Sequence, residues 1–258
     1  MDFNHFLTSY MPDPNIGSKQ HFKHMLDQSV LAEKLGYVAV SIPEHHLVNL
    51  LMMPSPLQMA VKISSLTNKI RLSTSVAVLP IHDMRTFAGE VATADILTEG
   101  RLVLGVARGA FAWELDRLGT PIESSKEKFI ESLEVLNSLL SKENYSFKGK
   151  YYNFNAITIM PRPISDPVPI MIAAMDPSSI RNAASNGYHV QSTVLSGTKK
   201  LLLERVNAFK EGQQDAGENG KLLRLSMQRM AYAAKDENDA KEKNLLAYEY
   251  YKRFDNMY

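Results

Sequence analysis

The sequence contains no cysteine, which excludes disulfides, thiolate catalysis and cysteine-ligated metals. Its formal net charge is only +1 and no basic block interrupts it, so nothing in the composition indicates a nucleic-acid or membrane partner. No apolar run approaches the ~20 residues of a membrane-spanning helix, and residues 1–10 lack the pattern of a signal peptide. We therefore expect a cytoplasmic protein.

The residues that are present have the composition of an ordinary globular protein, with 45% hydrophobic and 22% charged side chains. A chain of 258 residues is long enough to form one large α/β domain with a sizeable core. Since no linker or low-complexity tract divides the chain, we predict a single domain over residues 1–258.

Seven segments predict β-strands, and helices with one apolar face alternate with them. The strands are expected at 3–8, 37–42, 71–78, 102–107, 168–174, 189–194 and 223–232. The helices include 19–35, 56–66, 85–97, 198–215 and 237–254, and residues 145–154 form an inserted hairpin.

This alternation predicts an α/β fold of the (β/α)8-type (TIM) barrel rather than an open doubly wound sheet. The last strand–helix unit is missing from the chain. Truncation of a longer protein, imperfect closure, or closure by a partner chain would each account for this. We favour truncation, so the domain is expected to be incomplete at its C-terminal end.

The strand at 102–107 is an apolar run that ends in Arg108 and Gly109. In a barrel of parallel strands, the site is built at the carboxyl ends of the strands. A guanidinium there can bind a phosphate through two parallel hydrogen bonds, and a glycine lets a ligand approach the backbone. The alternative is a surface arginine at the end of a strand.

His45 and His46 follow the second strand, where an imidazole can act as an acid or base near neutral pH. Adjacent side chains point in different directions, so at most one of the two should face the site. A loop histidine that only forms hydrogen bonds is an equally weighted alternative. A metal site is disfavoured because the pair cannot easily bind one ion together and no zinc-type spacing is present.

Asp176-Pro-Ser-Ser179 opens a helix, whose free N–H groups could bind a phosphate. An ordinary helix N-cap is the more frequent case, and the Asp176 carboxylate would repel a phosphate. Ser178 and Ser179 could still donate hydrogen bonds from their hydroxyls. Residues 50–53, with two leucines and two methionines, form either core or an apolar pocket.

Three lesser features also lead to expectations. Ser124 and Glu127 have the spacing of a capping box that would open a helix. Trp113 is expected in a loop as a packing residue. His21 and His24 are expected to be exposed on the first helix.

Taken together, these stretches resemble the bacterial luciferase-like flavin-dependent monooxygenase family. The motifs that carry the resemblance occur in the family's order over essentially the whole chain: residues 3–12, 44–46, 74–80, 100–109 and 168–174. The family fold is a (β/α)-barrel with an insertion, in agreement with the strand count.

The resemblance implies a role for several residues. His45 matches the histidine that assists the reaction of the flavin peroxide in luciferases. Arg108 and Ser179 match positions that hold the flavin phosphate. Ser75-Val76 matches a non-proline cis peptide beneath the flavin ring.

Three positions depart from the luciferase pattern around the cofactor. Ala107 stands where luciferases can carry a reactive cysteine near the ring. Met175 and Asp176 replace a Glu-Ser pair, which weakens the phosphate assignment.

The resemblance implies a homodimeric enzyme that uses reduced FMN from a separate flavin reductase. With O2, it would insert one oxygen atom into a small apolar organic substrate. One alternative is F420-dependent hydride transfer, as in another branch of the superfamily. A second is a non-catalytic flavin-binding protein. His45 favours an enzyme, whereas the missing barrel end favours the binding protein.

Overall fold

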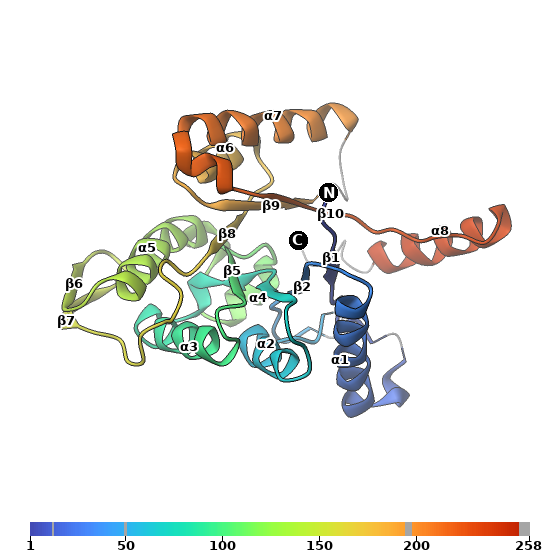
Figure 1. Cartoon of the computed structure of the whole chain (residues 1–258), viewed down its shortest axis with the longest axis horizontal. Helices are drawn as coiled ribbons and strands as arrows, with labels where there is room; N and C mark the ends of the chain where they lie inside the picture. The colour runs from blue at the N-terminus through green and yellow to red at the C-terminus, as the bar shows by residue number, and fades with distance from the viewer. Residues whose placement is uncertain (12, 49–50, 194–197, 253–258) are drawn as a thin grey trace.

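The computed structural model describes residues 1–11, 13–48, 51–193 and 198–252. Seven strands lie side by side in one sheet, in the order β1-β2-β3-β5-β8-β9-β10, and each neighbouring pair is parallel. These strands are β1 (Asn4–Phe6), β2 (Ala39–Ile42), β3 (Arg71–Thr74), β5 (Leu102–Ala107), β8 (Ile170–Ala173), β9 (His189–Thr193) and β10 (Leu225–Gln228). With the surrounding helices they form a nearly closed barrel, which confirms the predicted fold (Figure 1).

Helices lie between the strands and surround the sheet, except that α8 (Glu237–Lys252) follows the last strand and projects away from it (Figure 1). They are α1 (Ser18–Lys34), α2 (Pro56–Ser64), α3 (Met84–Leu97), α4 (Ala112–Arg117), α5 (Ile122–Ser141), α6 (Pro177–Ser185), α7 (Lys199–Asp215) and α8 (Glu237–Lys252). Short 3-10 helices occur at Pro14–Ile16, Leu79–Ile81 and Gly217–Leu222. Among the helices of the described residues, none combines the length and apolar character needed to cross a membrane.

Each of the seven predicted strand ranges contains an observed strand of the barrel. The range 71–78 holds two, because β3 ends at Thr74 and a separate strand, β4 (Ala77–Val78), pairs with β5. All four residues of β2 are buried, as expected for a parallel strand that is covered on both faces.

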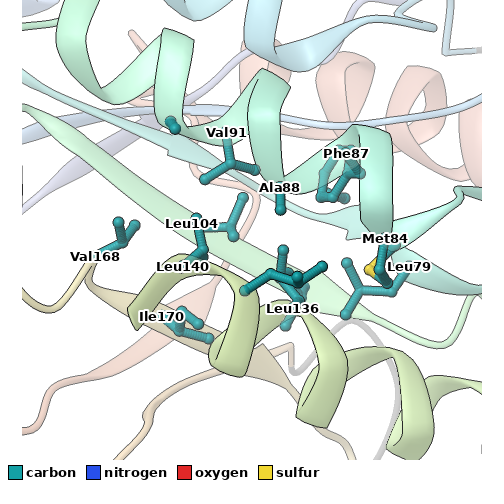
Figure 2. Close-up of a cluster of buried hydrophobic side chains, with 14 of the residues drawn as sticks. Leu79, Met84, Phe87, Ala88, Val91, Leu104, Leu136, Leu140, Val168 and Ile170 are labelled. Carbon is teal, nitrogen blue, oxygen red and sulfur yellow. The ribbon is translucent and has the colours of Figure 1, made fainter. Parts of the chain in front are cut away.

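The core is formed where the helices pack on the sheet. Figure 2 shows one cluster, in which Phe87 and Val91 of α3 and Leu136 of α5 pack around Leu104 of β5. These four side chains are at most 3% exposed. Burial of such large apolar side chains contributes about 1.5–3 kcal/mol each, so this contact anchors α3 and α5 to the middle of the sheet.

The inserted hairpin consists of β6 (Tyr145–Lys148) and β7 (Asn153–Ile157), which pair antiparallel. Its turn is held by Glu131 of α5, whose carboxylate accepts hydrogen bonds from the N–H groups of Lys150, Tyr151 and Tyr152. The predicted hairpin is therefore confirmed, and it is tied to the barrel by a helix.

Three local expectations were wrong. The helix expected to begin with a capping box starts earlier, at Ile122, and the Ser124 hydroxyl donates to the Pro121 carbonyl. His21 is only 8% exposed, because its ring nitrogen Nε2 contacts the carbonyl oxygen of Ser9 at 3.1 Å. Trp113 lies in helix α4 rather than in a loop, and is 38% exposed beneath the Arg117 guanidinium.

Candidate active site

The candidate residues follow the carboxyl ends of neighbouring parallel strands. His45 comes after β2, Ser75 after β3, Arg108 after β5 and Asp176 after β8. Parallel strands end at the same edge of a sheet, and in barrels of this kind that edge carries the active site. The topology therefore brings together segments that are up to 131 residues apart in the sequence.

Glu44 organises the segment that leads into the two histidines. Its side chain is only 1% exposed, and one carboxylate oxygen, Oε1, lies 3.0 Å from His46 Nε2 and 2.8 Å from His82 Nε2. The other oxygen accepts a hydrogen bond of 2.6 Å from the N–H of Val78 in β4. One buried carboxylate thus joins β2, β4 and the 3-10 helix that follows.

The ionisation of Glu44 follows from these contacts. Burial by itself would raise the pKa of this carboxyl, but hydrogen bonds from His46, His82 and Val78 outweigh it and lower the pKa to about 2. In return, the hydrogen bond to Glu44 raises the pKa of His46. We conclude that Glu44 is ionised at neutral pH and holds this part of the edge together.

His45 has a different set of partners from His46. Its Nδ1 lies 3.1 Å from Oε2 of Glu114, which is carried by α4 and is 4% exposed. Its ring stacks on Phe111, with centroids 4.8 Å apart and an interplanar angle of 27°. The two adjacent histidines therefore diverge, as the sequence predicts.

The peptide between Ser75 and Val76 is cis, as the family resemblance implies. The Ser75 hydroxyl donates a 2.6 Å hydrogen bond to Oε1 of Gln191, a residue of β9 that is 9% exposed. Gly105 of β5 lies beside this segment, and a Cβ there would be 2.0 Å from the Thr74 carbonyl oxygen. Glycine is thus needed at position 105 for β3 and β5 to approach each other here.

Arg108 is exposed and forms no hydrogen bond or ion pair with any residue in the described part of the chain. It directly follows Ala107, the last residue of β5, and precedes Gly109 in the left-handed region (φ 88°). A Cβ at Gly109 would lie 2.8 Å from Leu115, so the loop passes close to α4. The Arg108 guanidinium is available to bind an anion.

The start of α6 is already capped by its own chain. The Asp176 carboxylate accepts hydrogen bonds from the Ser178 hydroxyl and, at 3.1 Å, from the Ser179 N–H. The hydrogen bond from Ser178 is the main cause that lowers the pKa of Asp176, so this exposed carboxylate carries a negative charge at neutral pH. The predicted N-cap is confirmed. The Ser178 hydroxyl and the Ser179 N–H, which a bound phosphate would need as hydrogen-bond donors, already donate to Asp176.

Arg205 of α7 is buried and binds the segment that precedes the start of α6. Its side chain donates to the carbonyl oxygens of Met175, at 2.7 Å, and of Thr193 at the end of β9. Met175 itself is 48% exposed, and its sulfur accepts a hydrogen bond from the Ser192 hydroxyl. Arg205 therefore fixes the ends of β8 and β9 relative to each other.

Residues 51 and 53 belong to the core, with Leu51 7% and Met53 1% exposed, whereas residue 50 lies outside the described residues. No group of three or more His, Asp or Glu side chains could hold a metal ion within 1–11, 13–48, 51–193 and 198–252.

The sequence predicts the positions of His45, Ser75, Val76, Ala107 and Arg108 at this edge, but several partners were not found from it. These are Glu44, His82, Glu114, Gln191 and Arg205. Glu44 could have been suspected from its place beside two histidines. The others lie on distant elements, and no local pattern marks them.

Comparison with known proteins identifies relatives over the whole chain. The family model described as "Luciferase-like monooxygenase" matches residues 1–258. The oxygenase component of a flavin-dependent trigonelline monooxygenase from Acinetobacter baylyi is 32% identical over 86% of this chain. An F420-dependent glucose-6-phosphate dehydrogenase from Amycolatopsis mediterranei is 28% identical over 75% of it. This chain spans 62% and 60% of the lengths of these two relatives.

The fold also matches a solved structure. The monooxygenase RslO1 from Streptomyces bottropensis superposes with a TM-score of 0.88 at 25% identity. The match covers 98% of this chain and 78% of that one.

Proposed function

This chain belongs to the luciferase-like monooxygenase family, and we propose that it is an FMN-dependent oxygenase that receives its reduced flavin from a separate reductase. The related oxygenase component from Acinetobacter baylyi supports this assignment. The observation that carries it is a pair of residues at the same strand edge. His45 is bound by the buried Glu114 carboxylate, and exposed Arg108 has no side-chain partner among the described residues. Together these residues offer a proton-transfer group and an anion-binding group at one site.

Reduced FMN, when bound, would supply the two electrons that let one atom of O2 enter the substrate while the other leaves as water. Arg108 would hold the flavin phosphate by charge-assisted hydrogen bonds. Ser75, Val76 and Ala107, at the ends of β3 and β5, would lie against the ring. Among the proposed phosphate ligands, Arg108 fits best, because it has no competing partner among the described residues.

The helix end at Asp176 fits the phosphate less well. Ser178 and Ser179 would have to give up hydrogen bonds to Asp176 before donating to a phosphate. The two negative charges would also repel each other. Met175 and Asp176 are therefore proposed to border the cofactor site rather than to hold the phosphate.

The protein would contribute positioning, exclusion of water and proton transfer. His45 is the proposed catalytic group because one of its ring nitrogens is fixed by Glu114 while the ring is 19% exposed. His46, whose ring nitrogen contacts Glu44, would keep the loop in place.

F420-dependent hydride transfer is the second candidate, because one relative is an F420-dependent dehydrogenase. The two candidates differ in what they require after cofactor binding: oxygenation consumes O2, whereas hydride transfer does not. An anaerobic titration with reduced FMN and, separately, with reduced F420 distinguishes them. We expect saturable binding of reduced FMN and no comparable binding of F420.

The same experiment continues with isotopically labelled O2 and a panel of small organic substrates. The panel includes a long-chain aldehyde, a cyclic ketone and trigonelline, the last because of the relative's substrate. One labelled oxygen atom in a product supports the proposed function. Flavin binding without product for any member of the panel, and with H2O2 as the only oxygen product, favours a non-catalytic flavin-binding protein instead. Light scattering of the purified protein would test the homodimer that the family resemblance implies.

A further inference from the structure

We infer that Glu114 is a positioning residue that holds the ring proton of His45 on Nδ1, so that neutral His45 accepts a proton at Nε2. This inference rests on the proposed function only in assigning His45 to the reaction. The protonation pattern itself follows from contacts within the chain.

Glu114 uses both carboxylate oxygens on the histidine loop. Oε2 lies 3.1 Å from His45 Nδ1, and Oε1 accepts a hydrogen bond from the backbone N–H of His46. These partners are 69 and 68 residues away from Glu114 in the sequence. A buried side chain, 5% exposed, therefore spans from α4 to the loop after β2 and binds two consecutive residues there.

Two further contacts fix the orientation of the ring. The N–H of His45 donates a 2.9 Å hydrogen bond to the carbonyl of Met53. One face of the ring lies against Phe111, the residue directly before α4. The backbone, the ring face and Nδ1 are thus each held by a different group, and Nε2 has no hydrogen-bond partner among the described residues.

The chemistry of the carboxylate sets the tautomer. An ionised carboxylate only accepts hydrogen bonds, so the nitrogen facing it must carry the proton. In a neutral imidazole the other nitrogen then has a free lone pair. When Nε2 takes a proton from a reacting group, the positive ring lies 3.1 Å from Glu114, whose negative charge stabilises it.

The other two histidines at this edge contact a carboxylate through the other ring nitrogen. His46 and His82 both approach the Glu44 carboxylate through Nε2. Their Nε2 atoms are therefore occupied. Of these three rings, His45 alone meets its carboxylate through Nδ1, which leaves Nε2 available for proton transfer.

The test is a nitrogen NMR measurement of the tautomer of His45, at a pH where the ring is neutral and with neither flavin nor O2 present. Comparison with His45→Gln assigns the resonances. We expect Nδ1 in the protonated range and Nε2 in the unprotonated range. In Glu114→Gln this preference should be lost, because the amide NH2 group replaces one of the two carboxylate oxygens and cannot accept a hydrogen bond.

Asp116→Asn is the matched control, since Asp116 is an exposed acid on the same helix. It should leave the His45 tautomer unchanged. A proton on Nε2 in the unmodified protein overturns the inference, even if Glu114→Gln fails to fold. An unchanged His45 tautomer in folded Glu114→Gln also overturns the inference. In that case Glu114 would have only a structural role, and its replacement would lower only the melting temperature. Because no cofactor is used, failure here is separate from failure of the proposed function, which the FMN titration tests.

Discussion

Arg108 is the residue whose proposed role is simplest to isolate, because its guanidinium has no partner among the described residues. Arg108→Ala should weaken FMN binding by about 1.5–3 kcal/mol, the usual contribution of a charge-assisted hydrogen bond. Riboflavin, which lacks the phosphate, should bind almost unchanged. Calorimetry with both ligands checks this, and Arg117→Ala on nearby α4 is the control. Equal losses for FMN and riboflavin would mean that Arg108 does not bind the phosphate.

The neighbouring histidines should respond differently to removal. His45→Ala should leave FMN affinity nearly unchanged but lower oxygenation roughly 10²–10⁴-fold, as expected for lost proton transfer, with H2O2 released instead of product. His46→Ala should mainly lower the melting temperature, because it removes a hydrogen bond to buried Glu44. Product and H2O2 are measured per reduced flavin for both variants. Uncoupling in His46→Ala but not in His45→Ala would reverse the assignment.

The first turn of α6 shows how a helix end can limit a binding site. Asp176→Ser keeps a residue that caps helices well but removes the negative charge. If the phosphate lies near this end, FMN should bind roughly two- to fivefold more tightly, the size of a helix-end charge effect, while riboflavin binding stays the same. Equilibrium titration measures both affinities. An unchanged FMN affinity would place the phosphate away from α6.

The contact between β3 and β5 depends on the absence of a side chain at Gly105. A Cβ at this position would lie 2.0 Å from the Thr74 carbonyl oxygen, and backbone cannot move aside as a flexible side chain can. Gly105→Ala should therefore lower the free energy of unfolding by about 1–3 kcal/mol or more, as overpacking does. Chemical denaturation checks this.

The control for that experiment is Gly89→Ala in helix α3, where nothing lies within 4 Å of the added Cβ. There alanine should stabilise the protein by about 0.5–1 kcal/mol, because it restricts the unfolded chain and favours the helix. Similar effects at both positions would show that the strand contact is not the cause.

The whole molecule should have a stability maximum in weakly acidic solution because of the Glu44 cluster. The folded pKa of Glu44 is about 2, below its ordinary 4.5, so its contribution is complete above about pH 4.5 and is lost as the pH falls toward 2. The pKa of His46 is raised above 6.5, so its contribution is complete below pH 6.5 and is lost as the pH rises through the raised value.

Urea unfolding at a series of pH values measures this profile. Glu44→Gln should be destabilised at neutral pH by about 3–5 kcal/mol, as when one partner of a buried pair is removed. Its unfolding free energy should also lose most of the decline between pH 4.5 and 2. A variant that keeps the full decline would show that other carboxylates cause it.

The sequence by itself determined the barrel and the edge of the sheet at which the candidate site lies. Strands such as β2, β5 and β8 are short, mainly apolar segments, and helices such as α2 and α3 bury an apolar face. These are local patterns that burial requires whatever the neighbours are. The residues that end the strands, such as His45 and Arg108, could be found for the same reason, since parallel strands place their ends together.

Only the tertiary structure decided which partners those residues have. Glu114 contacts His45 across 69 positions, and Ser75 contacts Gln191 across 116. No periodicity encodes such pairs, because they depend on how separate elements pack. The same limit explains two errors: His21 is buried by a contact with Ser9, twelve positions away, and Trp113 lies in a helix rather than in a loop. Local order in the chain is set by neighbouring residues, whereas the chemistry of the site is set by groups that meet only after folding.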